Sequence, residues 1–206
     1  MQITNWPGLF LATTNSGKIR EIRLLLAGVP VAITTPADLA PPPPAPEENG
    51  TTFAENAALK AMAYAQASGL PTVAEDSGLA IDALDGRPGV HSARYDGATY
   101  PEKFANLYRE LAGHDRPWTA RFVCALALAM PGDQPHIAFT AEGIVEGEIT
   151  TPPRGSNGFG YDPVFLYPPY GSTLAEVDDA RKMAASHRGA AFRKLRAWLL
   201  NGRGVG

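Results

Sequence analysis

The segment that most constrains the fold is Ala120–Met130, in which every residue except Arg121 is apolar. An apolar run of this length is typical of a buried strand, and it is much shorter than the roughly 20 residues that a membrane-spanning helix needs. Two further strand-like segments follow it, at Ile137–Glu142 and Ile144–Ile149. We expect them to pair with the long run as antiparallel strands, so that a sheet forms part of the core.

The rest of the chain alternates short apolar runs with stretches of helical spacing, which is typical of an α/β protein. The apolar runs predict strands at Leu9–Thr13, Val29–Thr34, Thr72–Glu75 and Leu79–Leu84. Spacing and capping residues predict helices at Gly17–Ala27, Thr52–Ser68 and Pro101–Leu111, and a last helix that Ser186 caps and that ends near Asn201 and Gly202. The proline-rich stretch Ala40–Gly50 predicts an extended connector. We expect an α/β fold with a mixed sheet and flanking helices, in a single domain over residues 1–206 or in two closely fused lobes.

Composition and charge narrow the class of protein. Hydrophobic residues make up 45% of the chain, which is ordinary for a globular protein. The net charge of −3 lacks the excess of positive charge that is typical of proteins that bind duplex nucleic acid. The single cysteine, Cys124, excludes an internal disulfide and fits a reducing compartment. The segment Met1–Pro7 lacks the order of a signal peptide. We expect a soluble, cytoplasmic protein that binds neither nucleic acid nor a membrane.

An acidic pair follows one of the predicted strands. Glu75 and Asp76 come directly after an apolar segment, and Ser77 and Gly78 follow as a predicted turn. Carboxylates in such a place suit Mg²⁺, which keeps several waters and usually takes one or two protein carboxylates plus substrate phosphates. An ordinary polar turn after a strand is the alternative.

Three other polar clusters favour a ligand site over that alternative. Thr13–Lys18 lies where a strand passes into a helix, and a helix N-terminus with a nearby lysine favours phosphate, although the P-loop spacing is missing. Gly155–Phe165 embeds aromatic rings and an Asp among glycines, which is typical of a base-stacking loop or of a tight turn packed on the core. Lys182 and Ser186–Gly189 place cations at the start of the last helix, where the helix dipole favours an anion.

Five segments, in order along the chain, resemble the five motifs of the inosine/xanthosine triphosphate pyrophosphatase family, the Ham1-like pyrophosphatases of non-canonical purine nucleotides. The five are Leu11–Glu21, Glu47–Ala57, Ala74–Leu79 continuing through Pro88–Tyr95, Gly158–Phe165, and Ser186–Gly189. The resemblance covers the chain from about Leu9 to Leu200. It implies a long, bent central sheet with two lobes around a nucleotide cleft, and a homodimer. It also implies Mg²⁺-dependent hydrolysis of ITP, dITP and XTP to the monophosphate and pyrophosphate, which cleanses the nucleotide pool. Two features are less typical of the family, the Pro41–Pro44 run and Glu75, where many relatives have Asp.

The resemblance implies a role for each cluster. Asp76 is the expected general base and a metal ligand, and Glu47 or Glu48 completes the carboxylate set, with Glu47 favoured. The triphosphate is expected to contact Thr13, Thr14, Asn15, Ser16, Gly17 and Lys18, with Lys182 as a second cation and Ser77 touching the substrate. Base selection is expected to fall to Phe159, Gly160, Tyr161, Asp162, His187 and Arg188.

Arg188 is the residue we expect to read the base. Inosine and xanthosine carry a carbonyl at C6 where adenosine carries an amine, and arginine is a donor only, so it pairs with the carbonyl alone. A site that donates to such a group can reject an analogue lacking it by about 10⁴–10⁵. Guanine shares the carbonyl, so it must be rejected through its 2-amino group, by residues that the sequence does not identify.

Two other functions remain open at this point. A pyrophosphatase of the related Maf-like type would act on pyrimidine or modified nucleotides, but its opening Ser/Thr-rich Arg-Arg motif is absent, and Asn15 and Lys18 stand there instead. A non-catalytic nucleotide sensor would keep the fold and lose Asp76 or the acidic loop, and both are present.

Overall fold

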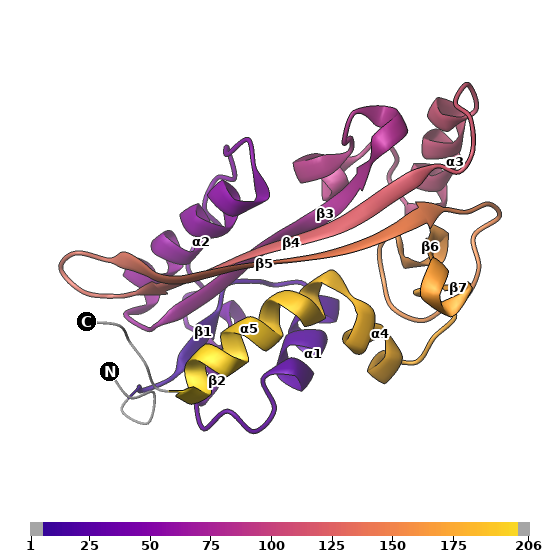
Figure 1. The fold of residues 1–206 in the computed structure, drawn as a ribbon. Helices are drawn as coiled ribbons and strands as arrows, with labels where there is room; N and C mark the ends of the chain where they lie inside the picture. The colour runs from indigo at the N-terminus through magenta and orange to yellow at the C-terminus, as the bar shows by residue number, and fades with distance from the viewer. Residues whose placement is uncertain (1–5, 202–206) are drawn as a thin grey trace. The chain divides into compact units, whose positions relative to one another are not determined.

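The computed structural model describes residues 6–201, so the predictions for Met1–Asn5 and Gly202 lie outside the described residues. Within that range the chain forms one mixed sheet in the order β2-β1-β3-β4-β5-β6-β7 (Figure 1). The strands are β1 Leu9–Leu11, β2 Ile33–Thr34, β3 Thr72–Ile81, β4 Thr119–Met130, β5 His136–Ile149, β6 Phe165–Tyr167 and β7 Ser172–Thr173. The helices are α1 Ser16–Leu25, α2 Phe53–Ser68, α3 Tyr100–Leu111, α4 Asp179–Ala185 and α5 His187–Asn201. The α/β class with a mixed sheet and flanking helices is confirmed.

Strand direction changes across the sheet. β1 runs parallel to both β2 and β3, with Leu9 opposite Ile33 and Phe10 opposite Thr72. β6 runs antiparallel to β5 and to β7. β4 and β5 are neighbours joined by residues 131–135 only, a connection that suits an antiparallel hairpin because parallel strands need a long crossover.

The chain divides into two compact units. The first unit contains residues up to Asp76, Cys124–Gly143 and the residues from Arg188 on, and the second contains Ser77–Val123 and Ile144–His187. β3, β4 and β5 therefore each contribute residues to both units.

The first unit has a core on each side of its strands, because neighbouring residues in a strand point to opposite faces. One core contains Leu9, Leu11, Val73, Leu126 and Leu128 with apolar residues of α1 and α5. The other contains Phe10, Ala12, Ala74, Ala127 and Ala129 with the alanines of α2. Figure 1 shows α2 on one side of these strands and α1 and α5 on the other. The alanine face of β4 lies against an alanine face of α2, so the helix can pack closely on the sheet.

The second unit has a single core rich in aromatic rings. Phe104, Leu107 and Leu111 of α3 pack with apolar residues of β3, β4 and β5 and with Tyr161 and Phe165. Phe122 and Phe165 are in contact, with ring centroids 4.4 Å apart.

Several predicted boundaries were wrong. β3 is one strand rather than two, since Ser77 and Gly78 continue the strand instead of forming a turn. β5 is likewise one strand over His136–Ile149. The predicted strand Val29–Thr34 shrinks to Ile33–Thr34, because Gly28 has a φ of +82° and Pro30 has no N–H to donate. The 7-residue helix α4 had not been predicted.

Other predictions were confirmed. Ser186 has an extended backbone and α5 begins directly after it. α2 begins with a capping box, in which Thr52 Oγ1 accepts from Glu55 N and Glu55 accepts from Thr52 N. Residues 42–50 form neither helix nor strand. Among the described residues, none of the helices is long and apolar enough to span a membrane.

Candidate functional site

The predicted phosphate loop lies at the start of α1 in the first unit. Asn15 caps the helix, its Oδ1 accepting from Lys18 N at 3.0 Å, and Thr13 Oγ1 accepts from Asn15 N at 3.2 Å. Thr14, Asn15 and Ser16 are exposed. The loop is therefore held by its own side chains while its outer residues stay accessible, as an anion-binding helix N-terminus requires.

A buried charge network ties this loop to the last helix. Lys18 Nζ lies 2.8 Å from Glu75 Oε1, and Arg188 Nη2 lies 3.1 Å from the same oxygen. Arg188 Nη1 also lies 2.6 Å from Glu21 Oε2. Burial alone would raise the pKa of Glu75, but Arg188 and Lys18 hold that pKa well below its ordinary value. Glu75 is thus an ionised bridge between two cations, and Arg188, at 2% exposure, lies between two carboxylates.

The acidic pair of β3 is split between the two faces of the sheet. Val73 and Glu75 point to the side of α1 and α5, where Cys124 Sγ lies 3.4 Å from Glu75 Oε2. Ala74 and Asp76 point to the side of α2. Asp76 is also inside the strand rather than at its end. The two carboxylates therefore serve different environments, although they are adjacent in sequence.

Asp76 lies among polar groups of α2 and of the preceding loop. Asn56 Nδ2 donates to Asp76 Oδ2 at 3.1 Å, and Lys60 Nζ lies 3.6 Å from Asp76 Oδ1 and 2.9 Å from Glu48 Oε2. Burial raises the pKa of Asp76 above its ordinary value, against the opposing effects of Lys60 and Asn56. A carboxyl with a raised pKa is a better proton acceptor than an exposed one.

The chemistry of this cluster fits a divalent cation. Glu48 and Asp76 approach the same ammonium group, that of Lys60, so their oxygens are directed at a shared positive charge. Glu47 and Glu48 of the acidic loop are both exposed, and Glu48 is the one that an ion pair joins to Lys60. Within residues 6–201 there is no group of three or more metal-ligating side chains. Mg²⁺ needs only one or two protein carboxylates when substrate phosphates supply further ligands.

The second unit holds the predicted base-recognition residues other than Arg188. Asp162 is buried, and its Oδ2 accepts from Phe159 N at 2.7 Å and from Lys182 Nζ at 2.5 Å. Lys182 Nζ also lies 4.7 Å from the centre of the Phe159 ring. Gly158 has a φ of +74°, and a Cβ there would lie 2.2 Å from Asp162 Oδ2, so only glycine allows this loop to close on the carboxylate.

A hydrogen bond of Tyr161 and a ring contact of His187 complete this second cluster. Tyr161 is buried and donates from its hydroxyl to Ser92 O at 2.9 Å. The His187 ring stacks on Phe122 at a centroid distance of 4.8 Å and an angle of 17°. The loop therefore places the Phe159 ring against a buried ion pair. Ser77 belongs to the same unit and is partly buried within β3.

The sequence pattern of the Ham1 family matches residues 9–198. The chain belongs to the Ham1 family. It is 51% identical over 188 residues to a dITP/XTP pyrophosphatase of Gloeobacter violaceus, with 91% of each chain covered. It is 50% identical over 196 residues to a dITP/XTP pyrophosphatase of Rhodospirillum centenum, covering 92% of this chain and 93% of that one. The family resemblance inferred from the five motifs is thereby confirmed.

Solved Ham1 structures share the fold. A HAM1 protein from Coxiella burnetii superposes with a TM-score of 0.85 at 40% identity, covering 94% of this chain and 98% of that chain. The Ham1 protein of Staphylococcus aureus gives a TM-score of 0.82 at 34% identity, covering 95% of this chain and 100% of that chain.

The structure sorts the predicted Ham1 site residues into two groups. The first unit contains Thr13–Lys18, Glu47, Glu48, Asp76 and Arg188, and the second contains Ser77, Phe159–Asp162, Lys182 and His187. Lys182, predicted to hold the triphosphate, contacts the base-recognition loop, while Arg188, predicted to read the base, contacts Glu21 and Glu75. These contacts do not test the two roles, which both stay predictions.

Three polar residues of the first unit were missed from the sequence. Asn56 and Lys60 lie four residues apart on α2, so they share the helix face that meets Asp76. Glu21 lies three residues after Lys18 on α1. The signal that could have found them is a polar side chain on a helix face that is otherwise apolar.

Proposed function

We propose that the chain hydrolyses the non-canonical purine nucleotides ITP, dITP and XTP to the nucleoside monophosphate and pyrophosphate. Membership of the Ham1 family and the dITP/XTP pyrophosphatases among its relatives support this activity. The observation that carries the proposal is the arrangement around β3, where a buried Asp76 with a raised pKa lies beside Glu48 and Lys60. Lys18, at the start of α1, is held by Glu75, and its charge is one of those that lower the pKa of Asp76 against the effect of burial.

Asp76 is the proposed general base. It would take a proton from a water whose oxygen bonds to the α-phosphorus while the bond from that phosphorus to the α–β bridging oxygen breaks and pyrophosphate leaves. Asn56 orients the carboxylate of Asp76, and the raised pKa of Asp76 favours proton acceptance. Phosphoryl transfer depends mostly on positioning and charge stabilisation, so the fixed geometry of this cluster supports the role.

The negative charge of the triphosphate needs cations. Lys18 and the N–H groups at the start of α1 are proposed to bind phosphate oxygens, with Thr13, Thr14, Asn15 and Ser16 shaping the loop. Glu48 and Asp76 are the residues that would hold Mg²⁺. The metal would neutralise charge on the phosphates and on the leaving pyrophosphate.

Base recognition is proposed for the second unit. Phe159 offers a ring for stacking, and the buried Asp162–Lys182 pair would hold the loop that carries this ring. His187 and Tyr161 would fix the shape of the pocket through Phe122 and Ser92.

The test is a panel of nucleoside triphosphates scored for pyrophosphate, inorganic phosphate and monophosphate. We expect pyrophosphate release to be fastest with ITP, XTP and dITP, and to stop when EDTA removes Mg²⁺. Reaction in ¹⁸O-labelled water should place the label in the monophosphate. Release of single phosphates, or equal rates for ATP and ITP, would contradict the proposal. A preference for pyrimidine nucleotides would indicate the Maf-like activity, and binding without turnover would indicate a sensor.

Three further properties are proposed with the activity. We expect a homodimer, to be measured by light scattering, and a cytoplasmic protein, to be measured by cell fractionation. We expect Mg²⁺ to be the physiological metal, which a comparison of divalent ions in the same assay would test.

A further inference from the structure

Asn56 is a buried polar residue whose side-chain oxygen and nitrogen both form hydrogen bonds. It lies in the first turn of α2 with an exposed fraction of 1%. Its Oδ1 accepts from Gly50 N at 2.9 Å, and its Nδ2 donates to Asp76 Oδ2 at 3.1 Å. One carboxamide therefore connects the loop before α2 with a carboxylate of β3.

The chemistry of these partners explains why an asparagine is needed. The Gly50 N–H is a donor only, so it must face the amide oxygen, and the amide nitrogen is then left to face the Asp76 carboxylate. Among side chains of this length, only a carboxamide offers an acceptor and a donor in such a fork. An aspartate has the same shape but would present an oxygen to each partner.

The loop is built to approach this carboxamide closely. A Cβ on Gly50 would lie 2.7 Å from Asn56 Oδ1 and 2.7 Å from Glu55 Cβ, so a larger residue would push the loop away. Glu48 lies two residues before Gly50 and is held by Lys60, one turn further along α2. Asn56 and Lys60 thus hold the same two partners, the acidic loop and Asp76.

We propose that Asn56 is a positioning residue that fixes the acidic loop and Asp76 relative to one another by clamping Gly50 N with its oxygen and Asp76 with its nitrogen. The inference rests on the proposed roles of Asp76 and Glu48. It predicts that loss of the clamp lowers kcat much more than it changes the nucleotide KM, because most of the phosphate contacts are proposed for the loop at the start of α1.

The test compares Asn56→Ala, which loses both hydrogen bonds, with Asn56→Asp, which keeps the acceptor for Gly50 N and loses the donor to Asp76. For ITP we expect kcat to fall by about 10–100-fold in both variants, the range seen when a residue supporting a site carboxylate is removed, with KM changed less than about threefold. Wild-type kcat in Asn56→Asp would overturn the proposal, and so would a loss confined to KM.

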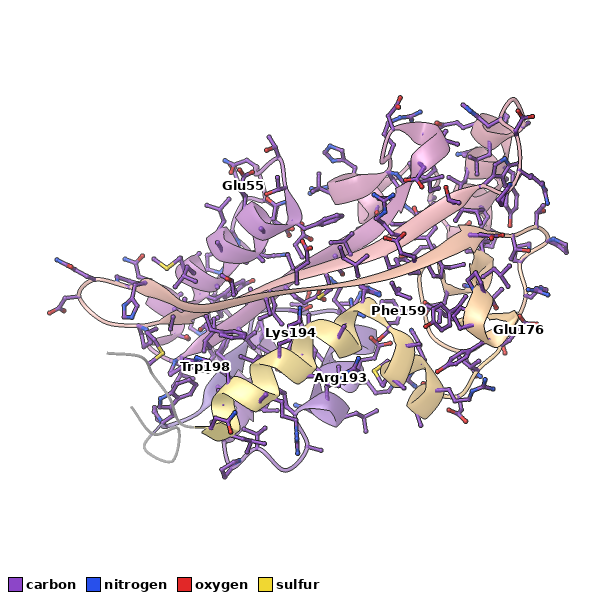
Figure 2. The ribbon with its side chains drawn as sticks, in the orientation of Figure 1. Glu55, Phe159, Glu176, Arg193, Lys194 and Trp198 are labelled. Atoms are coloured by element: carbon purple, nitrogen blue, oxygen red, sulfur yellow. The ribbon has the colours of Figure 1, made fainter. Side chains whose placement is uncertain are left out.

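Glu55→Ala is the matched control. Glu55 is the next residue along the chain, and Figure 2 shows it where α2 begins. Its carboxylate accepts from Thr51 N and Thr52 N. We expect this variant to lower the melting temperature while kcat stays within about twofold of wild type. An equal kcat loss in Glu55→Ala and Asn56→Ala would reduce Asn56 to a helix-stability role and overturn the proposal.

Hydrogen–deuterium exchange of the Gly50 amide, followed by NMR, tests the clamp without any substrate. We expect the amide to be protected in wild type and in Asn56→Asp, and to exchange at least about tenfold faster in Asn56→Ala, since an N–H that loses its acceptor opens to solvent. Unchanged exchange in Asn56→Ala would overturn the clamp even if activity fell. If wild type cleaves none of the nucleotides, the proposed function fails while this measurement still decides the clamp.

Discussion

The two units of the chain handle polar groups in different ways. In the first unit, charged side chains of α1, α2, α5 and the acidic loop converge on β3, with one set around Glu75 and another around Asp76. In the second unit, the buried ion pair Asp162–Lys182 lies among aromatic rings. The first arrangement suits a ligand that carries several charges, and the second suits a flat ring with polar edges.

The difference shows how one strand can serve two purposes. β3 supplies Glu75 and Asp76 to the first unit and continues into the core of the second with Leu79 and Ile81. The charged half of the strand is stabilised by pairing, and the apolar half by burial. We therefore expect substitutions in the first unit to change the rate of chemistry, and substitutions in the second to change the choice of nucleotide.

The largest effect is expected on stability when a buried ion pair loses its cation. Arg188→Met in the first unit and Lys182→Met in the second should each lower the free energy of unfolding by about 3–5 kcal/mol, because a buried carboxylate loses its partner. Urea unfolding measures both. Adding Glu21→Gln to Arg188→Met should recover part of the loss, since it removes one of the buried charges. Losses below about 1 kcal/mol would show that these pairs are hydrated in solution.

The next effect separates the rate of hydrolysis from the choice of nucleotide. Asp76→Asn should lower kcat by at least about 10²-fold for every nucleotide, because the shape of the side chain is kept while the base is lost. Its unfolding free energy should stay near that of wild type. Asp162→Asn, the matched change in the second unit, should leave kcat for the preferred nucleotide much closer to that of wild type. Equal kcat losses in both variants would remove the distinction between the units.

A smaller effect is expected on nucleotide choice. The ratio of kcat/KM for ITP over ATP should fall by about tenfold in Lys182→Met, which alters the group beneath Phe159, and should change little in Arg188→Lys. The reverse pattern would restore the roles expected from the sequence, with Arg188 reading the 6-carbonyl and Lys182 binding the phosphates.

The smallest effect is expected for the N-terminal capping box, which occurs in a helix of each unit. Thr52 caps α2 in the first unit and Thr99 caps α3 in the second, each in a capping box with a glutamate. Thr52→Ala and Thr99→Ala should each cost about 1 kcal/mol of unfolding free energy, with kcat unchanged. A kcat loss in Thr52→Ala alone would show that the acidic loop depends on this cap as well as on Asn56.

Local signals explain what could be predicted of the fold. The capping box of α2, the apolar run of β4 and the proline-rich connector each depend on neighbouring residues, so their patterns are visible in the sequence. The predicted turn at Ser77–Gly78 was wrong because both residues lie inside the continuous strand β3, whose place in the sheet outweighs their local preference. α4 was missed because its only clear signal is the Asp178 cap of a 7-residue helix.

The sequence alone determined to which family the chain belongs, because each motif is a short segment whose residue types and order are readable. Only the tertiary structure decided the partners. Arg188 meets Glu75 across 113 residues and Glu21 across 167, and no local pattern encodes such pairings. The pleat of β3 places Glu75 and Asp76 on opposite faces, and the packing of α1, α2 and α5 then decides which cations reach each carboxylate.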